Sequence, residues 1–290
     1  MRTHTIWTTV GVAVVVVAGA VAVPFVVGST AASSADAPSS PTASSSDAAA
    51  PAVPHVDDTT LAALPEAEYS AVISGLMPFD RTVTTDTVFQ LRADAPLFGA
   101  ARTTPVARFA ASDFLRQPST VVGVERDGDW ELVLTPARQQ LPSAAGGSAA
   151  AQTAAWVPLT SLREVSTPTS RVVISTKDQS VSIVDTAGHV THRFDAGVGT
   201  ADTPTPTGVT GYLEQRYVDP SQGTGDHPIQ LTSLHSSAAD EPYGGHDGGL
   251  IGLHWNATTS GAVSHGCVRL DAEAVAAVDA LPLGTLVTVE

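Results

Sequence analysis

Short runs rich in β-branched and aromatic residues fill the chain from Thr82 onward, and turn residues separate them. Runs of this length and composition are typical of strands. One late helix is predicted over residues 272–281, because Asp271 is a favourable N-cap and Glu273 lies in the first turn. Many strands followed by one helix predict a mostly-β protein. The candidate strands are residues 88–91, 106–109, 120–124, 130–134, 156–159, 172–175, 181–184, 190–194, 208–213, 228–231 and 286–289.

The first 54 residues are not expected to belong to this β fold. An apolar run covers residues 10–27, and Arg2 precedes it without a nearby acidic residue. The pattern predicts a signal peptide or signal-anchor helix over residues 1–28, in or across the cytoplasmic membrane. Residues 29–54 are nearly all Ala, Ser, Thr, Pro and Asp, which predicts a disordered linker. The rest of the chain is therefore expected outside the cytoplasm, membrane-anchored or secreted, and the sequence leaves cleavage open.

Charge and cysteine content exclude several classes of function. The 290 residues include 14 Lys and Arg but 29 Asp and Glu, for a formal net charge of −15. An acidic surface repels phosphate, so nucleic-acid binding is not expected. The single cysteine, Cys267, cannot form an intramolecular disulfide or a multi-cysteine zinc site. It is therefore either a buried small residue or a reactive thiol.

Two regions precede the part of the chain that contains the cysteine. Residues 55–85 are predicted to form a short helical lead-in, with a helix within residues 61–76. Residues 86–166 resemble a bacterial Src-homology-3-like module, through Ala-Pro-Leu-Phe at 95–98, Gly-Asp-Trp at 128–130 and Ala-Trp-Val-Pro at 155–158. The resemblance implies a small β-barrel-like module for cell-wall contact or domain support. Trp130 and Trp156 are expected in its core, because large aromatic residues form the centre of such small domains.

The residues around Cys267 are of the types that activate a thiol. A cysteine attacks as the thiolate, and a neighbouring histidine is the usual base near neutral pH. His265 is two residues before the cysteine, whereas His254 ends a short apolar run. The small and polar residues 256–263 can loop back and bring His254 beside Cys267. Gly266 permits a sharp turn with successive backbone N–H groups pointing at one spot, as an oxyanion hole requires.

The segment Ser264-His265-Gly266-Cys267-Val268-Arg269-Leu270, with His254 upstream, resembles the signature of the L,D-transpeptidase catalytic domain (YkuD type). The resemblance covers residues 170–290 and implies an L,D-transpeptidase-like β-sandwich. By position, it makes Cys267 the nucleophile and His254 its proton acceptor and donor. It places His265, Gly266 and Ser264 at or around the oxyanion hole, and Arg269 and Trp255 toward the substrate.

The resemblance implies a peptidoglycan L,D-transpeptidase on the cell-wall side of the membrane. Cys267 would form a thioester with a stem peptide and transfer it to an acceptor amine during cell-wall cross-linking. The implied chemistry needs no metal or organic cofactor, and carbapenem β-lactams are expected as covalent inhibitors.

Alternatives to this function stay open. One is an L,D-carboxypeptidase-type hydrolase, in which water replaces the amine, and another is a non-catalytic cell-wall-binding protein. A His/His/Cys zinc site is disfavoured, because His265 and Cys267 are too close in sequence to bind one ion comfortably. His235 and His246 are expected in substrate-side loops or at the surface.

Overall fold

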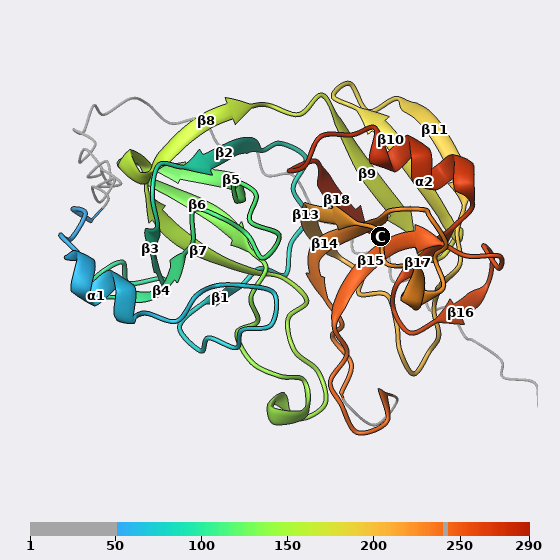
Figure 1. Cartoon of the computed structure of the whole chain (residues 1–290), viewed down its shortest axis with the longest axis horizontal. Helices are drawn as coiled ribbons and strands as arrows, with labels where there is room; N and C mark the ends of the chain where they lie inside the picture. Colours follow the sequence, from blue (N-terminus) through green and yellow to red (C-terminus); the bar gives the residue numbers. More distant parts are fainter. Residues whose placement is uncertain (1–50, 240–242) are drawn as a thin grey trace, which may run out of the picture. The chain divides into compact units, whose positions relative to one another are not determined.

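The computed structural model describes residues 51–239 and 243–290 (Figure 1). The predicted signal or anchor helix, and almost all of the predicted linker, lie outside the described residues. Within the two described ranges, no helix is long and apolar enough to cross a membrane. The described chain consists mainly of strands with one late helix, so the expected mostly-β fold is confirmed.

Eight strands between residues 77 and 166 form the first sheet. The strand order is β4-β3-β7-β6-β5-β2-β8, every pairing along it is antiparallel, and β1 pairs with β7. The predicted hairpin forms where Asp127 pairs with Trp130 across Gly128, whose φ of 60° suits a tight turn. As expected, Trp130 and Trp156 are both buried. The strands are β1 (Met77–Pro78), β2 (Thr87–Leu91), β3 (Ala95–Phe98), β4 (Pro105–Phe109), β5 (Thr120–Asp127), β6 (Trp130–Thr135), β7 (Thr153–Pro158) and β8 (Leu162–Ser166), with 3-10 turns η1 (Ser143–Ala145) and η2 (Leu159–Ser161).

The lead-in segment departs from the sequence prediction. Its helix is α1 (Asp58–Ala63), capped by the Asp57 side chain, and residues 65–76 are not helical. The reason is Pro65, which disfavours helical geometry at the preceding residue; Leu64 accordingly takes an extended ψ of 147°. The chain beyond it instead forms isolated bridges to the first sheet, including Val72 with Arg138.

A second sheet of eight strands is built from residues 170–289 in the order β11-β10-β9-β18-β13-β14-β15-β17 (Figure 1). Two pairings are parallel, β18 with β9 and β15 with β17. The strands are β9 (Ser170–Ser175), β10 (Ser180–Asp185), β11 (Val190–Asp195), β13 (Val209–Tyr217), β14 (Ile229–His235), β15 (Leu250–Trp255), β17 (Val268–Leu270) and β18 (Leu286–Val289). A separate pair is formed by β12 (Val198–Gly199) and β16 (Ala262–Ser264). The 3-10 turn η3 (Pro220–Gln222) follows β13, and helix α2 (Ala272–Asp279) follows β17.

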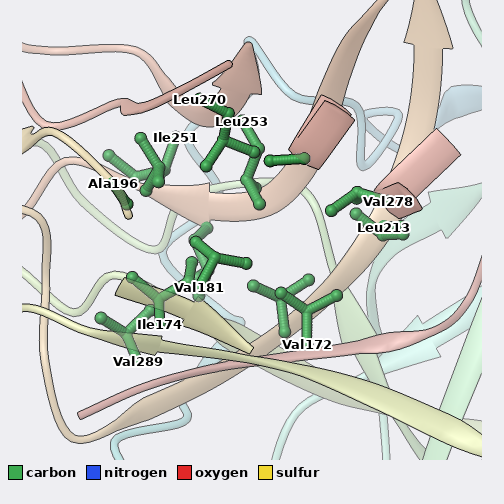
Figure 2. Packing of buried hydrophobic residues seen from close by; sticks show 14 of the residues in the cluster. Val172, Ile174, Val181, Ala196, Leu213, Ile251, Leu253, Leu270, Val278 and Val289 are labelled. Atoms are coloured by element: carbon green, nitrogen blue, oxygen red, sulfur yellow. The ribbon is translucent and has the colours of Figure 1, made fainter. Parts of the chain in front are cut away.

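The core of the second sheet is aliphatic (Figure 2). Helix α2 packs against β14, β15 and β17, and the Asp271 side chain caps it as predicted. Ile251 and Leu253 of β15 and Leu270 of β17 belong to this core. Because side chains alternate along a strand, the other face of β15 and β17 is left for the residues of the candidate site.

The two sheets share one hydrophobic cluster. Tyr212 of β13 and Leu286 of β18, both almost fully buried, belong to the same cluster as Phe98, Trp130 and Trp156 of the first sheet. Buried polar contacts add to it. The hydroxyl of Ser233 donates to the side chain of Gln152 at 2.7 Å, and the guanidinium of Arg138 donates to the carbonyl of Ser236 at 2.9 Å. The second sheet is therefore covered in part by the first.

Candidate active site

Cys267 lies directly before β17, beside Gly252 of the neighbouring strand. β15 and β17 run parallel with Leu253 opposite Val268, so the preceding pair is Gly252 and Cys267. The Gly252 N–H donates to Cys267 Sγ at 3.4 Å, and Sγ lies 3.9 Å from the carbonyl oxygen of Leu250. The strand pairing thus fixes the sulfur over β15, where a glycine leaves the space above the strand open.

His254 lies two residues beyond Gly252 on β15, and therefore on the same face as Cys267. Its Nδ1 is 2.9 Å from the carbonyl oxygen of Trp255. A carbonyl oxygen can only accept a hydrogen bond, so Nδ1 carries the proton and Nε2 keeps its lone pair. The backbone therefore selects the tautomer in which Nε2 is the base.

A tight turn over residues 264–267 presents the thiol. Gly266 has a φ of 109°, and a Cβ at this position would lie 3.1 Å from Cδ1 of Ile251. Only glycine adopts this geometry without strain. The hydroxyl of Ser264 accepts from the Gly266 N–H at 3.2 Å and donates to the Cys267 carbonyl. The Gly266 N–H is thus engaged within the turn, and the expected oxyanion hole around residues 264–267 stays a prediction.

Two threonines hold this turn from a distant loop. The hydroxyl of Thr205 donates to the Gly266 carbonyl at 2.7 Å, and that of Thr203 donates to the Ser264 carbonyl at 3.1 Å. Thr205 is itself fixed, because its hydroxyl accepts from the Gly199 N–H at 2.9 Å. The loop that contains Thr203 and Thr205 therefore supports the turn that precedes the thiol.

Burial favours the uncharged forms of the Cys267 thiol and the His254 imidazole. It raises the pKa of the thiol, although the Gly252 N–H and the positive charge of Arg269 act in the opposite direction. Burial also lowers the pKa of His254; Arg269 lowers it further, and the bond to the Trp255 carbonyl opposes the shift. Both shifts favour a thiol and a neutral imidazole at neutral pH.

A cavity of about 510 Å³ opens over the pair. Its lining combines both halves of the described chain. From the second sheet and its loops come Tyr217, Gln222, Thr224, Ile229, Leu231, His235, Asp247, Gly248, Gly249, Leu250, Gly252, His254 and Cys267; from the lead-in and the first sheet with its loops come Tyr69, Ser70, Val72, Phe114, Arg138 and Leu141. The cavity is large enough for a peptide segment or a small drug-sized molecule.

The remaining residues predicted for the site lie around it. His265 is exposed, and its carbonyl accepts from the Tyr243 hydroxyl at 3.3 Å. The ring of Trp255 stacks on His227 at 5.4 Å. Arg269 lies opposite His254 in the parallel pairing. In the described part of the chain, the residues lining the cavity include neither Trp255 nor Arg269.

Of the two other histidines, His246 is exposed, as expected. His235 is not: it is buried, with Nε2 2.6 Å from the carbonyl oxygen of Pro136. Burial and the nearby positive charge of Arg138 lower the pKa of His235 to about 3, so it is a neutral structural residue.

The sequence prediction missed every cavity residue that precedes β9. Tyr69, Val72 and Phe114 form an exposed apolar edge, and the rings of Tyr69 and Phe114 meet edge to face at 5.1 Å. Arg138 lines the same cavity but is almost fully buried. No local motif marks these residues, because they reach the cysteine only through the packing of the two sheets.

The arrangement places a cysteine thiol and a histidine imidazole on one face of two paired strands, beside a cavity. In residues 51–239 and 243–290, no group of three or more His, Cys, Asp or Glu side chains is placed to hold a metal ion. The family model of the L,D-transpeptidase catalytic domain (YkuD) matches residues 169–289, which confirms the expected catalytic domain for this part of the chain.

Solved structures of similar fold come from several bacteria. A fused Zn-dependent amidase/peptidase/peptidoglycan-binding domain-containing protein from Clostridium acetobutylicum is 20% identical, with a TM-score of 0.29, over 42% of this chain and 52% of that one. An L,D-transpeptidase from Stackebrandtia nassauensis is 17% identical, with a TM-score of 0.29, over 42% and 55%. An L,D-transpeptidase from Mycobacterium smegmatis is 15% identical, with a TM-score of 0.32, over 59% and 90%.

The chain thus covers about half the length of the first two structures. No curated protein was found to match it. The Src-homology-3-like character of residues 86–166 stays a prediction.

Proposed function

We propose that this chain is a peptidoglycan L,D-transpeptidase that works on the cell-wall side of the cytoplasmic membrane. The observation that carries the proposal is the placement of Cys267 and His254 on one face of β15 and β17, over a cavity, within the segment that matches the catalytic-domain model. The extracytoplasmic location rests on the apolar run at 10–27 and on the location of the substrate.

The first half of the proposed reaction forms a thioester. Nε2 of His254 takes the proton of the Cys267 thiol as Sγ bonds to the carbonyl carbon of an L,D-peptide bond in a stem peptide. The carbonyl electron pair moves onto oxygen, and the backbone N–H groups of His265 and Cys267 are the candidate donors to that oxyanion. When the carbonyl re-forms, the C–N bond breaks, and His254 gives its proton to the departing amine.

The second half transfers the acyl group. An acceptor amine from a neighbouring stem attacks the thioester carbonyl, and His254 accepts its proton. The C–S bond then breaks, and the thiolate recovers the proton from His254. Water in place of the amine would give the hydrolysis of an L,D-carboxypeptidase, so the reaction products distinguish the two activities.

The experiment is incubation of the full chain with purified muropeptides, followed by mass spectrometry of the products. Cross-linked dimers are expected from the wild type, whereas Cys267→Ala should give none while keeping the wild-type circular dichroism spectrum. His246→Ala, which changes an exposed histidine, is the matched control and should keep full activity. Trimmed monomers alone would replace the transferase with a hydrolase, and unchanged muropeptides would support a wall-binding role.

The same chemistry supports covalent inhibition by carbapenem β-lactams. Their strained lactam carbonyl is an electrophile that an activated thiol can open, with the acyl group retained on sulfur. Intact-protein mass spectrometry should find one drug adduct on the wild type and none on Cys267→Ala.

A further inference from the structure

Arg138, on the loop that follows β6, carries a positive charge into the wall of the cavity. Its residue exposure is only 5%, and it lines the same cavity as Cys267 and His254. Charged side chains are rarely buried to this degree unless they are paired or functional. In a chain with a formal charge of −15, a buried cation in the wall of the cavity that contains the thiol is a specific feature of this site.

Backbone carbonyls fix the direction of this guanidinium. Nη1 donates to the carbonyl of Ser236 at 2.9 Å, and Nη2 donates to the carbonyl of Gly248. The backbone of Arg138 is held as well, because its N–H donates to Ala71 and its carbonyl accepts from Ile73. Neither acceptor carries a charge. Among the described residues, no carboxylate lies within ion-pair distance of Arg138, and the carboxylate of Asp247 acts on the guanidinium from beyond that distance.

The order of groups from Gly248 into β15 indicates that Arg138 and His254 lie on opposite sides of the sulfur. Gly248 accepts from Arg138, Leu250 and Gly252 contact Sγ, and His254 follows. The Ser236 N–H donates to the Gly249 carbonyl, so hydrogen bonding between the chain segments of β14 and β15 continues up to Gly249. In extended chain two residues span roughly 7 Å, and we expect about this separation between the Gly248 and Leu250 carbonyls.

The positions of His254 and Arg138 relative to Sγ indicate where the two halves of the substrate would lie. If His254 protonates the departing amine, the leaving residue lies toward His254 and the retained acyl half extends toward Arg138. We propose that Arg138 binds a carboxylate on the acyl half of the donor stem peptide, within about two residues of the bond that is cleaved. Arginine suits this role because its planar fork meets both carboxylate oxygens. The inference rests on the proposed function and adds a specificity residue from outside the catalytic domain.

The test compares two donor stem peptides with the full chain. One has its acyl-half carboxylates free, and the other has them amidated. The wild type should bind and turn over the free-carboxylate donor with a KM lower by roughly ten- to a hundredfold, since a hydrogen-bonded charge contributes on that scale. Arg138→Gln should raise the KM of the free-carboxylate donor by the same factor and leave both the amidated donor and kcat nearly unchanged. A wild type that does not distinguish the donors would overturn the proposal, whether or not the variant folds.

A purely structural role gives a different result. If Arg138 only clamps the Ser236–Gly248 loop, Arg138→Gln lowers the turnover of both donors equally, and the proposal fails. A lower melting temperature is expected in either case, because the variant loses the bonds to Ser236 and Gly248. Calorimetric binding of both donors to Cys267→Ala separates this question from catalysis. A preference for the free carboxylate in that variant supports Arg138 even where no cross-linking is detected, whereas equal binding overturns its role.

Discussion

At the scale of single residues, burial favours the neutral forms of both Cys267 and His254. Burial raises the pKa of Cys267 and lowers that of His254, so a resting thiolate–imidazolium pair is disfavoured. An imidazole with a lowered pKa stays unprotonated at neutral pH, and its Nε2 is ready to accept the thiol proton. The Trp255 carbonyl fills the place that a carboxylate takes in other nucleophile–histidine sites, orienting the ring without adding charge.

His254→Ala should therefore lower kcat/KM by about 100- to 10,000-fold, the usual contribution of a general base. His265→Ala should have little effect, because that side chain is exposed and only its carbonyl is engaged. In the wild type, activity should fall on acidification through a pKa below the ordinary histidine value of 6.5, as His254 becomes protonated. Steady-state kinetics over pH 4–8 measure both effects. A larger loss in His265→Ala than in His254→Ala would exchange the roles of the two histidines.

The sequence could single out Cys267 and His254, because one short segment and one strand end contain them, and the structure places both beside one cavity. The other side of the cavity could not be predicted. Arg138, Tyr69 and Phe114 are more than a hundred residues from the cysteine, and no local pattern relates them to it. The hydrogen bond from the Gly266 N–H to Ser264 could not be predicted either, because only the fold sets the direction of the Ser264 hydroxyl.

At the scale of elements, residue composition predicted most strands of both sheets. The errors concern one helix that a proline ends and several short strands. A helix was predicted within residues 61–76, yet the effect of Pro65 on Leu64 ends the helix there. Strands β1, β3, β8, β12, β16 and β17 were not predicted. Four of them have only two or three residues, and such short strands depend on their partners. β17 is the one that fixes Cys267, through its parallel pairing with β15.

Strand β13 also carries a buried acid whose protonation affects stability. Oε2 of Glu214 is buried without a hydrogen-bond partner in the described structure, close to Asp113 and to the buried Tyr212 hydroxyl. Burial, with the charge of Asp113, raises the pKa of Glu214 to about 8 from an ordinary value of 4.5. Between these two values the folded chain holds a proton that the unfolded chain releases, so stability falls as the pH rises from about 4.5 to 8.

Glu214→Gln removes this titration at nearly constant volume. The variant should match the wild type near pH 4.5 and exceed its free energy of unfolding at pH 8 by an amount on the order of a few kcal/mol. Urea unfolding at pH 5 and pH 8 measures the difference.

Burial also raises the pKa of Asp86, to about 7, so the stability of Glu214→Gln should still depend on pH with the same sign, but less strongly. The exposed Glu273→Gln is the control and should not change the slope; an equal slope in Glu214→Gln and wild type would contradict the assignment.

At the scale of the whole molecule, the two sheets of the described chain pack on each other through one shared hydrophobic cluster. The shared cluster covers Tyr212 and Leu286, which have 0% and 1% exposure, with side chains of the first sheet. Buried polar groups of the second sheet depend on the first as well: Ser233 bonds to Gln152, and His235 to the Pro136 carbonyl. A buried group that loses its partner costs about 1–3 kcal/mol. The region before β9 thus supplies buried contacts that support the second sheet, in addition to part of the cavity wall.

A fragment of residues 170–290 should therefore be far less stable than one of residues 51–290, although it contains both Cys267 and His254. Removing the first sheet exposes the shared cluster and removes Gln152 and the Pro136 carbonyl, the partners of Ser233 and His235. It also removes Arg138 from the cavity wall. We expect the shorter fragment to bind a hydrophobic dye, to lose its near-ultraviolet circular dichroism and to remain unlabelled by a carbapenem. The longer fragment keeps Pro51, whose carbonyl accepts from the Trp130 indole, and should retain full labelling. A monomeric shorter fragment that melts cooperatively within a few degrees of the longer one would show that the second sheet is independent of the first.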